Sequence, residues 1–585
     1  MATVEIDGTR PGPAIDGALW GTNLTNLASA AETVEHPLFV GRARAINVRV
    51  VRWPGGNNAS AYDWKRNEMI RPGRRVPRPE GVDLGRILRF VHEIGAELSI
   101  TVNFGTMTAQ DAADLVEFLN GPPDSEWGRR RAELGFPEPL GVRFFEVGNE
   151  ENQPHMWAYS WTAESPEKYF FGGEEERRGF YADGPKGDAF KTAGGPNQTY
   201  TLRFPPVRDV RAFWAPTQRD AEAGRWEEWL PVSTLSGQPP DAKVFELDAE
   251  RGVLRFGNGV RGAVLPKGVM LVEYTTYGHD GFLAFARAMR AAPSNVPIQI
   301  GAAVLPFRDG VPIADPDTMR EIFAQMDFYV RHQYDSSLPV RAYGDYNARR
   351  QFAADRVDTL KAVYERVASY VRSLGLPRAP AVAVTEWNLF LNEDFWHLNR
   401  TLGGAVFAAE WFVRVLNAGL EAGLPVWYAN QFALGGGNLS LIRSQTNHSV
   451  APMGYVFQGF GSWAGSRLLP VAVDGPGARA YDREVPLLAA AAALSPDGRT
   501  LRVALVNNAE TESVGVALRT EGLSVGEGRL WRLAGDSPEA HNERDPQNIA
   551  LREEPAASPV GEIALPPHSV VFLELAVEAS APRGP

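Results

Sequence analysis

Residues 142–150, VRFFEVGNE, and residues 381–388, AVAVTEWN, share one pattern: an apolar run ends in polar side chains that include a glutamate. Runs that are apolar on both faces are typical of parallel strands, which helices cover on one side and a packed barrel interior on the other. Parallel barrel strands all end on the same side, so polar residues at their carboxyl ends meet at one rim. The two stretches therefore predict barrel strands that place Glu150 and Glu386 at the mouth.

The chain from residue 13 to 465 repeats this pattern, because short β-branched runs alternate with amphipathic helical stretches. One helix start is marked by Thr108 and Asp111, the spacing of a capping box. The pattern predicts an α/β protein built on a (β/α)8 TIM barrel. Its eight strands are expected at residues 15–21, 46–53, 97–103, 142–148, 297–303, 326–332, 381–386 and 425–430.

Two segments break the alternation. Residues 192–278 lack a helical period and consist of short strand-like runs separated by Gly and Pro, which predicts a small β module inserted in the loop between the fourth strand and its helix. Residues 466–577 contain further strand-length runs, which predict a C-terminal β-sandwich. We expect residues 1–12 to add a strand to that sandwich.

Composition excludes several functions. The net charge of −12 is spread along the chain without a Lys/Arg-rich stripe, so we expect no nucleic acid partner. No window approaches roughly 18 uninterrupted apolar residues and the N-terminus lacks signal-peptide features, so we expect a cytoplasmic protein without membrane contact. The chain has no Cys, and its nine His are scattered without an HExxH motif, so we expect no metal and no cofactor. No lysine falls at a predicted strand end, which argues against a Schiff-base aldolase.

Paired carboxyl groups at a barrel mouth suit cleavage of glycosidic bonds, where one group protonates the leaving oxygen and the other attacks the anomeric carbon. A single glutamate at a strand end has a simpler explanation, because such ends meet loops and solvent. The two glutamates together, on strands four and seven and with Asn149 before the first, favour the catalytic interpretation.

Several motifs, in this order and spacing, resemble those of the clan A retaining glycoside hydrolases and, within them, family 51, best known for α-L-arabinofuranosidases. They are VVRWPGGNNASAYDW (50–64), TVNFGT (101–106), the stretch from Val116 to Glu150, RHQY (331–334), TEWN (385–388) and NQFAL (430–434). The resemblance implies a retaining, arabinofuranosidase-like exo-enzyme acting on plant-type oligosaccharides or polysaccharides. It also suggests assembly into trimers or hexamers.

Carried over by position, the resemblance implies that Glu150 is the acid/base and Glu386 the nucleophile, with carboxyl groups ~5 Å apart. It assigns the remaining site residues to substrate binding. Asn149 would hold the sugar's 2-hydroxyl, Arg52 and Tyr334 would hydrogen-bond Glu386, His332 would line the site, Asn57 and Gln431 would grip the sugar, and Asn103 and Trp427 complete the expected set. For Trp427, as for Trp53 and Trp387, packing inside the barrel is the open alternative.

Two features depart from the family pattern. The first-strand motif WGTNLTN carries Thr25 where the family usually has a glutamate that contacts arabinose, so the preferred sugar can differ. The inserted module brings Trp157, Trp161, Trp214, Trp226 and Trp229, which either stack on sugars or pack the module's core. We expect the module to shape the leaving-group subsites or an oligomer contact. An endo-β-glucanase or xylanase, another glycosidase of the clan, and a non-catalytic sugar-binding protein remain as alternatives.

Overall fold

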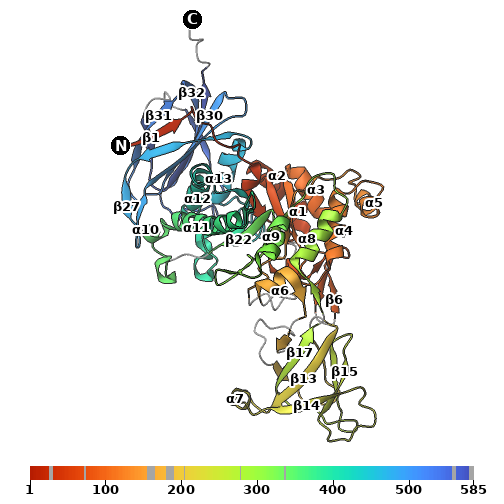
Figure 1. Ribbon diagram of the computed structural model, residues 1–585. Coiled ribbons are helices and arrows are strands. Elements are labelled where there is room, and N and C mark those ends of the chain that lie inside the picture. Colours follow the sequence, from red (N-terminus) through yellow and green to blue (C-terminus); the bar gives the residue numbers. More distant parts are fainter. Residues whose placement is uncertain are drawn as a thin grey trace. The chain divides into compact units, whose positions relative to one another are not determined.

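The computed structural model describes residues 1–25, 31–71, 74–153, 165–174, 176–178, 190–202, 205–276, 278–334, 338–555 and 562–578 (Figure 1). Within that part of the chain, no helix is long and apolar enough to cross a membrane. Trp157 and Trp161 lie outside the described residues.

Eight strands form a closed barrel in which the order around the barrel follows the order along the chain. This confirms the predicted (β/α)8 fold. The strands are β2 (Gly21–Asn23), β3 (Val50–Trp53), β7 (Glu97–Val102), β8 (Phe144–Val147), β19 (Gln299–Ala302), β22 (Phe328–Gln333), β23 (Ala381–Trp387) and β24 (Val426–Gln431). The pairings recorded between them are parallel.

The first strand lies later than residues 15–21. Asp16 accepts a hydrogen bond from the backbone of Ala18 and caps a short 3-10 helix, Gly17–Leu19, so β2 begins only at Gly21. The apolar side chains that suggested a strand are buried from this turn instead. Trp20, for example, is fully buried and stacks on Phe460 with ring centroids 5.8 Å apart.

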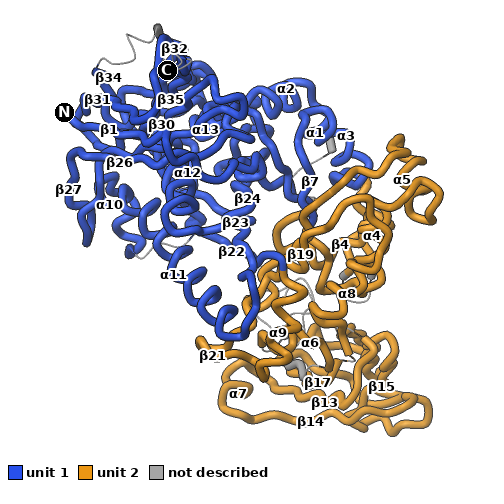
Figure 2. The backbone as a smooth tube through the Cα atoms, turned by 45° about the horizontal axis from the view of Figure 1, so that its top comes forward, with its two compact units in different colours: residues 1–53, 80–100, 327–585 blue, residues 54–79, 101–326 orange. Residues whose placement is uncertain are grey.

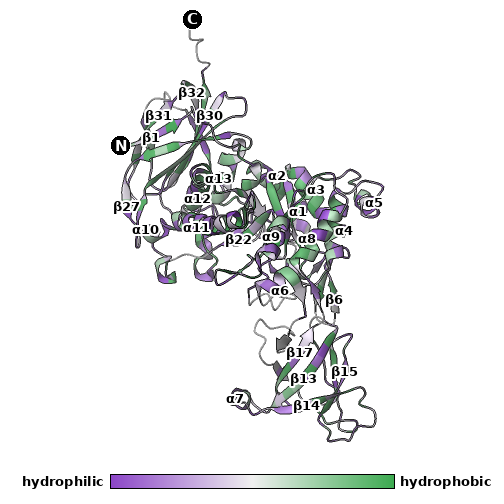
Figure 3. Ribbon diagram, in the orientation of Figure 1, coloured by the Kyte–Doolittle hydropathy of each residue, from purple (hydrophilic) through white to green (hydrophobic). Residues whose placement is uncertain are grey.

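The helices alternate hydrophilic and hydrophobic residues along their length (Figure 3). The capping box at Thr108 and Asp111 is present at the start of α4. The helices that follow barrel strands include α2 (Pro37–Ala45), α3 (Leu84–Ile94), α4 (Ala109–Asn120), α8 (Phe282–Ala291), α9 (Pro316–Gln325), α11 (Phe352–Ser373), α12 (Leu402–Glu421) and α13 (Pro452–Phe460).

By its internal contacts the chain divides into two units (Figure 2). Unit 1 comprises residues 1–53, 80–100 and 327–585, and it contains two C-terminal sheets. In the four-stranded sheet, β1 (Ala2–Asp7) lies between β26 (Val471–Asp474) and β31 (Val514–Glu521), so the N-terminal strand is paired with C-terminal ones. The six-stranded sheet has the order β25-β29-β30-β35-β32-β33, and apolar side chains from both sheets form one buried cluster. Its strands are β25 (Arg467–Leu469), β29 (Leu488–Leu494), β30 (Thr500–Asn507), β35 (Ser569–Val577), β32 (Val525–Leu533) and β33 (Arg552–Pro555).

Unit 2 comprises residues 54–79 and 101–326. It holds an eight-stranded sheet that begins earlier than residue 192, because β10 (Glu176–Arg178) and β11 (Phe190–Thr192) pair with β17 (Gly268–Thr276). The other strands are β12 (Thr199–Thr201), β13 (Val207–Ala215), β14 (Glu227–Val232), β15 (Val244–Asp248) and β16 (Val253–Phe256). Trp229 is 1% exposed in this sheet's core, and Trp214 and Trp226 pack against buried neighbours. These three tryptophans therefore serve the packing of the module.

Candidate active site

Glu386 lies near the carboxyl end of β23, a strand in which all seven residues are buried. Its two carboxylate oxygens have different donors. Arg52 Nη1 donates to Oε1 at 2.9 Å, and the Tyr334 hydroxyl donates to Oε2 at 2.8 Å. A guanidinium and a phenol both stabilise the ionised carboxylate, which is the form a nucleophile needs.

Arg52 is fully buried at the end of β3, and a second acceptor fixes its position. The same Nη1 atom donates to Asn23 Oδ1 at 2.9 Å. Asn23, at the end of β2, in turn donates through Nδ2 to the backbone oxygen of Thr385 at 2.9 Å. Residues near the ends of β2, β3 and β23 thus hold the cation beside Glu386, which is what a preorganised charge requires.

Tyr334 follows β22 directly, and a buried arginine from α11 holds its backbone. Arg356, 4% exposed, donates to the backbone oxygens of Tyr334 (3.0 Å), Asn388 (2.7 Å) and Leu389 (2.8 Å). One guanidinium therefore ties the segment after β22 to the segment after β23. Arg356 thereby positions both the Tyr334 phenol and the Glu386 carboxylate to which the phenol donates.

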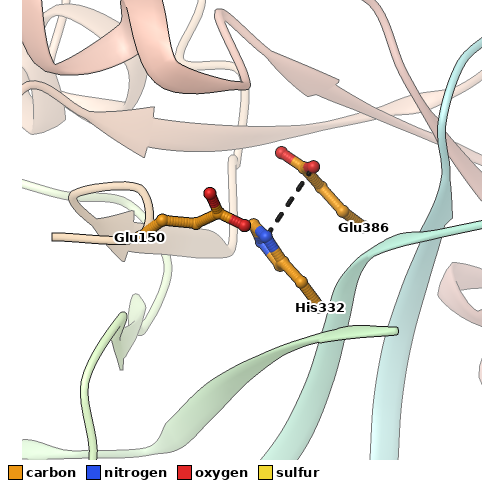
Figure 4. Close-up of side chains that lie close together, drawn as sticks. All are labelled: Glu150, His332 and Glu386. Atoms are coloured by element: carbon orange, nitrogen blue, oxygen red, sulfur yellow. Dashed lines mark ion pairs between the residues drawn. The ribbon is translucent and has the colours of Figure 1, made fainter. Parts of the chain in front are cut away.

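His332 lies beside Glu386 on β22. Its Nδ1 atom is 3.7 Å from Glu386 Oε2 (Figure 4). Its Nε2 atom is 3.1 Å from the hydroxyl of Thr385. Figure 4 draws Glu150, which follows β8, together with these two residues.

Two carboxylates and an imidazole are also a set that binds divalent cations. At Glu386, however, both oxygens already accept hydrogen bonds, one of them from a guanidinium. A cation there would have to compete with a fixed positive charge at 2.9 Å. These hydrogen-bond donors therefore favour a role for Glu386 as a reactive carboxylate over a role as a metal ligand.

Glu150 lies in a sharp turn after β8. Gly148 has φ +81° and Glu150 has φ +52°, a left-handed conformation that costs a non-glycine residue roughly 1–2 kcal/mol. Glu151 stabilises the turn, because its buried Oε1 accepts from the backbone of Asn149 at 3.1 Å and from the hydroxyl of Ser60. Glu146 is also fully buried, so both glutamates that flank Glu150 are interior groups.

Asn149 is buried, and its amide is oriented by a neighbour from the β3 loop. Its Nδ2 donates to Asn57 Oδ1 at 3.0 Å. Asn57 thus contacts Asn149 and fixes which way its amide faces. Tyr169 supports the same strand end, since its hydroxyl donates to the backbone oxygen of Val147 at 2.7 Å and accepts from the backbone of Ala303 at 2.9 Å. Burial raises the pKa of Tyr169 well above its ordinary value, so this donor stays protonated.

Two expected substrate-binding residues have other partners. Asn103 donates through Nδ2 to the backbone oxygen of Tyr62 and to the hydroxyl of Thr106, both at 2.9 Å, so its amide protons tie a loop together. Gln431 is 1% exposed and donates to the backbone oxygen of Leu439 at 2.9 Å. These two side chains support the strand ends rather than present free amides.

The prediction that Trp427 binds the substrate is wrong. It is the second residue of β24, at the amino end of a strand whose carboxyl end carries Gln431. It packs near Phe328, the first residue of β22, and the guanidinium of Arg378 lies 5.6 Å from its ring centroid. A strand advances ~3.3 Å per residue, so Trp427 lies too far from the mouth to contact a sugar there. Trp53 and Trp387 are at most 1% exposed, and Trp387 stacks on Trp411 of α12 with ring centroids 4.5 Å apart, so its ring packs between the barrel and the helices.

The sequence interpretation missed four residues that organise the site: Asn23, Thr385, Arg356 and Tyr169. Asn23 and Thr385 could have been noticed, because each is a polar residue near the carboxyl end of a predicted strand. Arg356 and Tyr169 gave no such signal, since each lies in a helix away from the motifs.

A closed parallel barrel with a glutamate held by arginine and tyrosine at the end of its seventh strand is the arrangement of a glycoside-hydrolase-like barrel. Comparison with known proteins agrees. The family described as "Alpha-L-arabinofuranosidase 1 domain" matches residues 42–169. An "Intracellular exo-alpha-(1->5)-L-arabinofuranosidase" of Bifidobacterium longum is 31% identical over 134 residues, which are 22% of this chain and 23% of that protein. The aligned region thus spans about a quarter of this relative's length.

The whole fold has counterparts among solved structures. A family 51 α-L-arabinofuranosidase from Bifidobacterium longum aligns over 98% of both chains, with a TM-score of 0.65 and 16% identity. An α-L-arabinofuranosidase from Thermotoga maritima, solved as an arabinose complex, aligns over 98% of this chain and 100% of its own, with a TM-score of 0.62 and 18% identity. The expected resemblance is confirmed: the chain is similar to the family 51 α-L-arabinofuranosidases in barrel sequence and in fold.

Proposed function

We propose that the chain is a retaining glycoside hydrolase with α-L-arabinofuranosidase-like exo-action on plant-type oligosaccharides or polysaccharides. The observation that carries this proposal is the Glu386 carboxylate, buried at a strand end and held by donors on both oxygens. A pocket that only bound neutral sugars would have little reason to bury a paired charge, because desolvating the pair is costly.

The mechanism follows from the two glutamates. Glu150, protonated, gives its proton to the leaving oxygen while Glu386 attacks the anomeric carbon and forms a glycosyl ester. Glu150 then removes a proton from water, whose oxygen displaces Glu386 and releases the sugar. The Glu386 carboxylate, held at both oxygens, supports this double displacement, because a positioned carboxylate nucleophile forms the covalent intermediate that distinguishes retaining enzymes from inverting ones.

Asn149 supplies specificity in this proposal. Its amide, oriented by Asn57, would bond the sugar's 2-hydroxyl, and a bond that strengthens as the ring flattens lowers the barrier.

Thr25 is 7% exposed just beyond β2 and offers a hydroxyl where the family has a carboxylate. This residue favours a second candidate, a glycosidase of the same clan with another preferred sugar.

Two further parts of the proposal rest on the relatives. We propose an intracellular location, because the Bifidobacterium relative is named intracellular. We also propose a homo-oligomer, a trimer or hexamer, which the family resemblance suggested and light scattering after size exclusion would measure.

A panel of nitrophenyl glycosides tests the proposal, with Glu386→Ala as the inactive control. We expect the α-L-arabinofuranoside to be hydrolysed faster than the β-xyloside and β-glucoside. If another glycoside is hydrolysed faster, the proposed sugar preference is wrong, but the proposed mechanism stands. Equal rates for the wild type and the control would leave only the sugar-binding alternative.

A further inference from the structure

A cleft of about 480 Å³ lies in unit 1 between α13 and the six-stranded sheet, apart from Glu386. Its described lining includes Trp531 of β32, Glu553 of β33 and Glu574 of β35. It also includes Gln458 of α13 and Arg49, which precedes β3. The volume is within the range of roughly 300–1,000 Å³ typical of small-molecule sites.

Trp531 faces this cleft because of its register in the sheet. The neighbouring Leu530 points into the sandwich core, so Trp531 lies on the opposite face. Its cross-strand partner Phe572 packs edge-on against Phe460 of α13, with ring centroids 5.0 Å apart. Trp531 is only half-buried, and the guanidinium of Arg529 lies 5.0 Å from its ring centroid. An indole is thus held in place and partly accessible.

Two polar side chains of the cleft, Glu574 and Arg49, are held in place by hydrogen bonds. Glu574 accepts from the hydroxyl of Ser462 at 2.9 Å and from Arg502 Nε at 3.2 Å. Arg49 donates through Nη2 to the backbone oxygen of Gly461 at 2.9 Å. Gln458 and Glu553 are exposed at the rim, where planar amide and carboxylate groups can pair with hydroxyls.

The charges select the ligand class. Glu553 and Glu574 line the cleft with Arg49, and Glu574 is also paired with Arg502 and Arg529, so acidic and basic side chains are mixed there instead of forming the cationic patch that phosphate, sulfate or a nucleic acid would need. An aromatic plane with surrounding amide, carboxylate and guanidinium groups suits a neutral ring that has an apolar face and a hydroxylated edge. That description fits a pyranose or furanose residue.

A second cleft of unit 1 can be compared with the cleft at Trp531. It has about 440 Å³ and is lined by charged residues that include Glu5, Asp7, Arg10 and Arg519, but its described lining contains no aromatic side chain. Its size is similar and it offers nothing on which a sugar ring could stack.

We propose that the cleft at Trp531 is a non-catalytic carbohydrate-binding site, which holds a stretch of polysaccharide away from the active site. The ligand class follows from the cleft's own chemistry. The choice of arabinose-containing polysaccharides as the first probes rests on the proposed function.

Affinity gel electrophoresis of the full chain in gels containing wheat arabinoxylan or linear arabinan tests this site. The Glu386→Gln background prevents hydrolysis of the gel polysaccharide. On that background we compare Trp531→Ala, the rim variant Gln458→Ala, and Tyr481→Ala as a matched control, because Tyr481 is an exposed aromatic of the C-terminal region outside the cleft. Thermal unfolding checks that each variant is folded.

We expect Trp531→Ala to weaken retardation by about fivefold or more in apparent Kd, Gln458→Ala to weaken it less, and Tyr481→Ala to leave it unchanged. In the otherwise wild-type chain, Trp531→Ala should keep kcat/KM on a nitrophenyl arabinofuranoside. Equal retardation of Trp531→Ala and Tyr481→Ala, no retardation in either gel, or a changed oligomeric state as the only effect of Trp531→Ala would overturn the proposal.

Because binding is read without turnover, these outcomes do not depend on whether the chain hydrolyses arabinofuranosides. Failure of the nitrophenyl panel with retained, Trp531-dependent binding would count against the proposed function alone. Hydrolysis without Trp531-dependent binding would count against this site alone.

Discussion

Arg52 and Glu386 form a buried ion pair, with Nη1 and Oε1 2.9 Å apart and side chains that are 0% and 9% exposed. The pair joins β3 to β23 in the interior of unit 1. Removing one partner of such a pair leaves an uncompensated charge, whereas removing both does not. The pair therefore links the chemistry of the site to the stability of the fold.

Replacing Arg52 by Met should lower the free energy of unfolding by about 3–5 kcal/mol, because Glu386 would then be buried without its cation. The double variant Arg52→Met/Glu386→Gln should recover part of that loss. Scanning calorimetry or urea unfolding of the two single variants and the double variant measures the coupling. Additive effects of the two substitutions would show that the charges do not interact.

Tyr334→Phe removes the donor to Glu386 Oε2. A hydrogen bond to a charged group contributes about 1.5–3 kcal/mol, so kcat should fall roughly 10- to 150-fold if that bond is used in the transition state. Steady-state kinetics on a nitrophenyl glycoside measures it, with Tyr481→Phe as an exposed control. An unchanged kcat would mean that the phenol is dispensable.

Arg356 should act only through the residues that it positions. Arg356→Lys keeps the charge but cannot reach three carbonyls with one planar fork, so kcat should fall while the chain stays folded. In the Tyr334→Phe background the same substitution should cost clearly less, since the phenol has already been removed. The same fold-loss in both backgrounds would place Arg356 outside this network.

Glu150→Ala should reduce kcat by roughly 10²–10⁴-fold, with a smaller loss for substrates whose leaving group needs no protonation. Azide should restore turnover by attacking the glycosyl ester, and the glycosyl azide should keep the substrate's anomeric configuration. Glu133→Ala, an exposed glutamate of α5 (Glu126–Glu133), is the matched control. An azide product of inverted configuration would assign a different role to Glu150.

The barrel was predictable because its strands carry two signals at once, apolar runs and polar ends. The first strand was placed too early because residues 18–20 are as apolar as a strand, and only the side-chain cap from Asp16 turns them into a 3-10 helix. A local hydrogen bond of this kind is invisible to periodicity.

The site was predictable where a motif lies directly at a strand end, as for Glu386, Arg52 and Tyr334. The prediction for Trp427 was wrong because the residue lies on a barrel strand, as expected, but at its amino end and not at the mouth. Asn103 and Gln431 were identified as polar strand-end residues, but the sequence does not reveal which backbone carbonyls their amides bond. Arg356 comes from a helix whose stripe of buried residues gives no hint that a guanidinium lies among them.

The central claim is that Glu386 forms a covalent bond to the sugar, and peptide mapping tests it most directly. Glu150→Ala, incubated with a dinitrophenyl α-L-arabinofuranoside, should accumulate the glycosyl ester because the base of the second step is missing. After quenching in acid and proteolysis, the added pentosyl mass should lie on the peptide that contains Glu386. A mass on another carboxylate, or turnover to a product of inverted configuration without any adduct, would contradict the account.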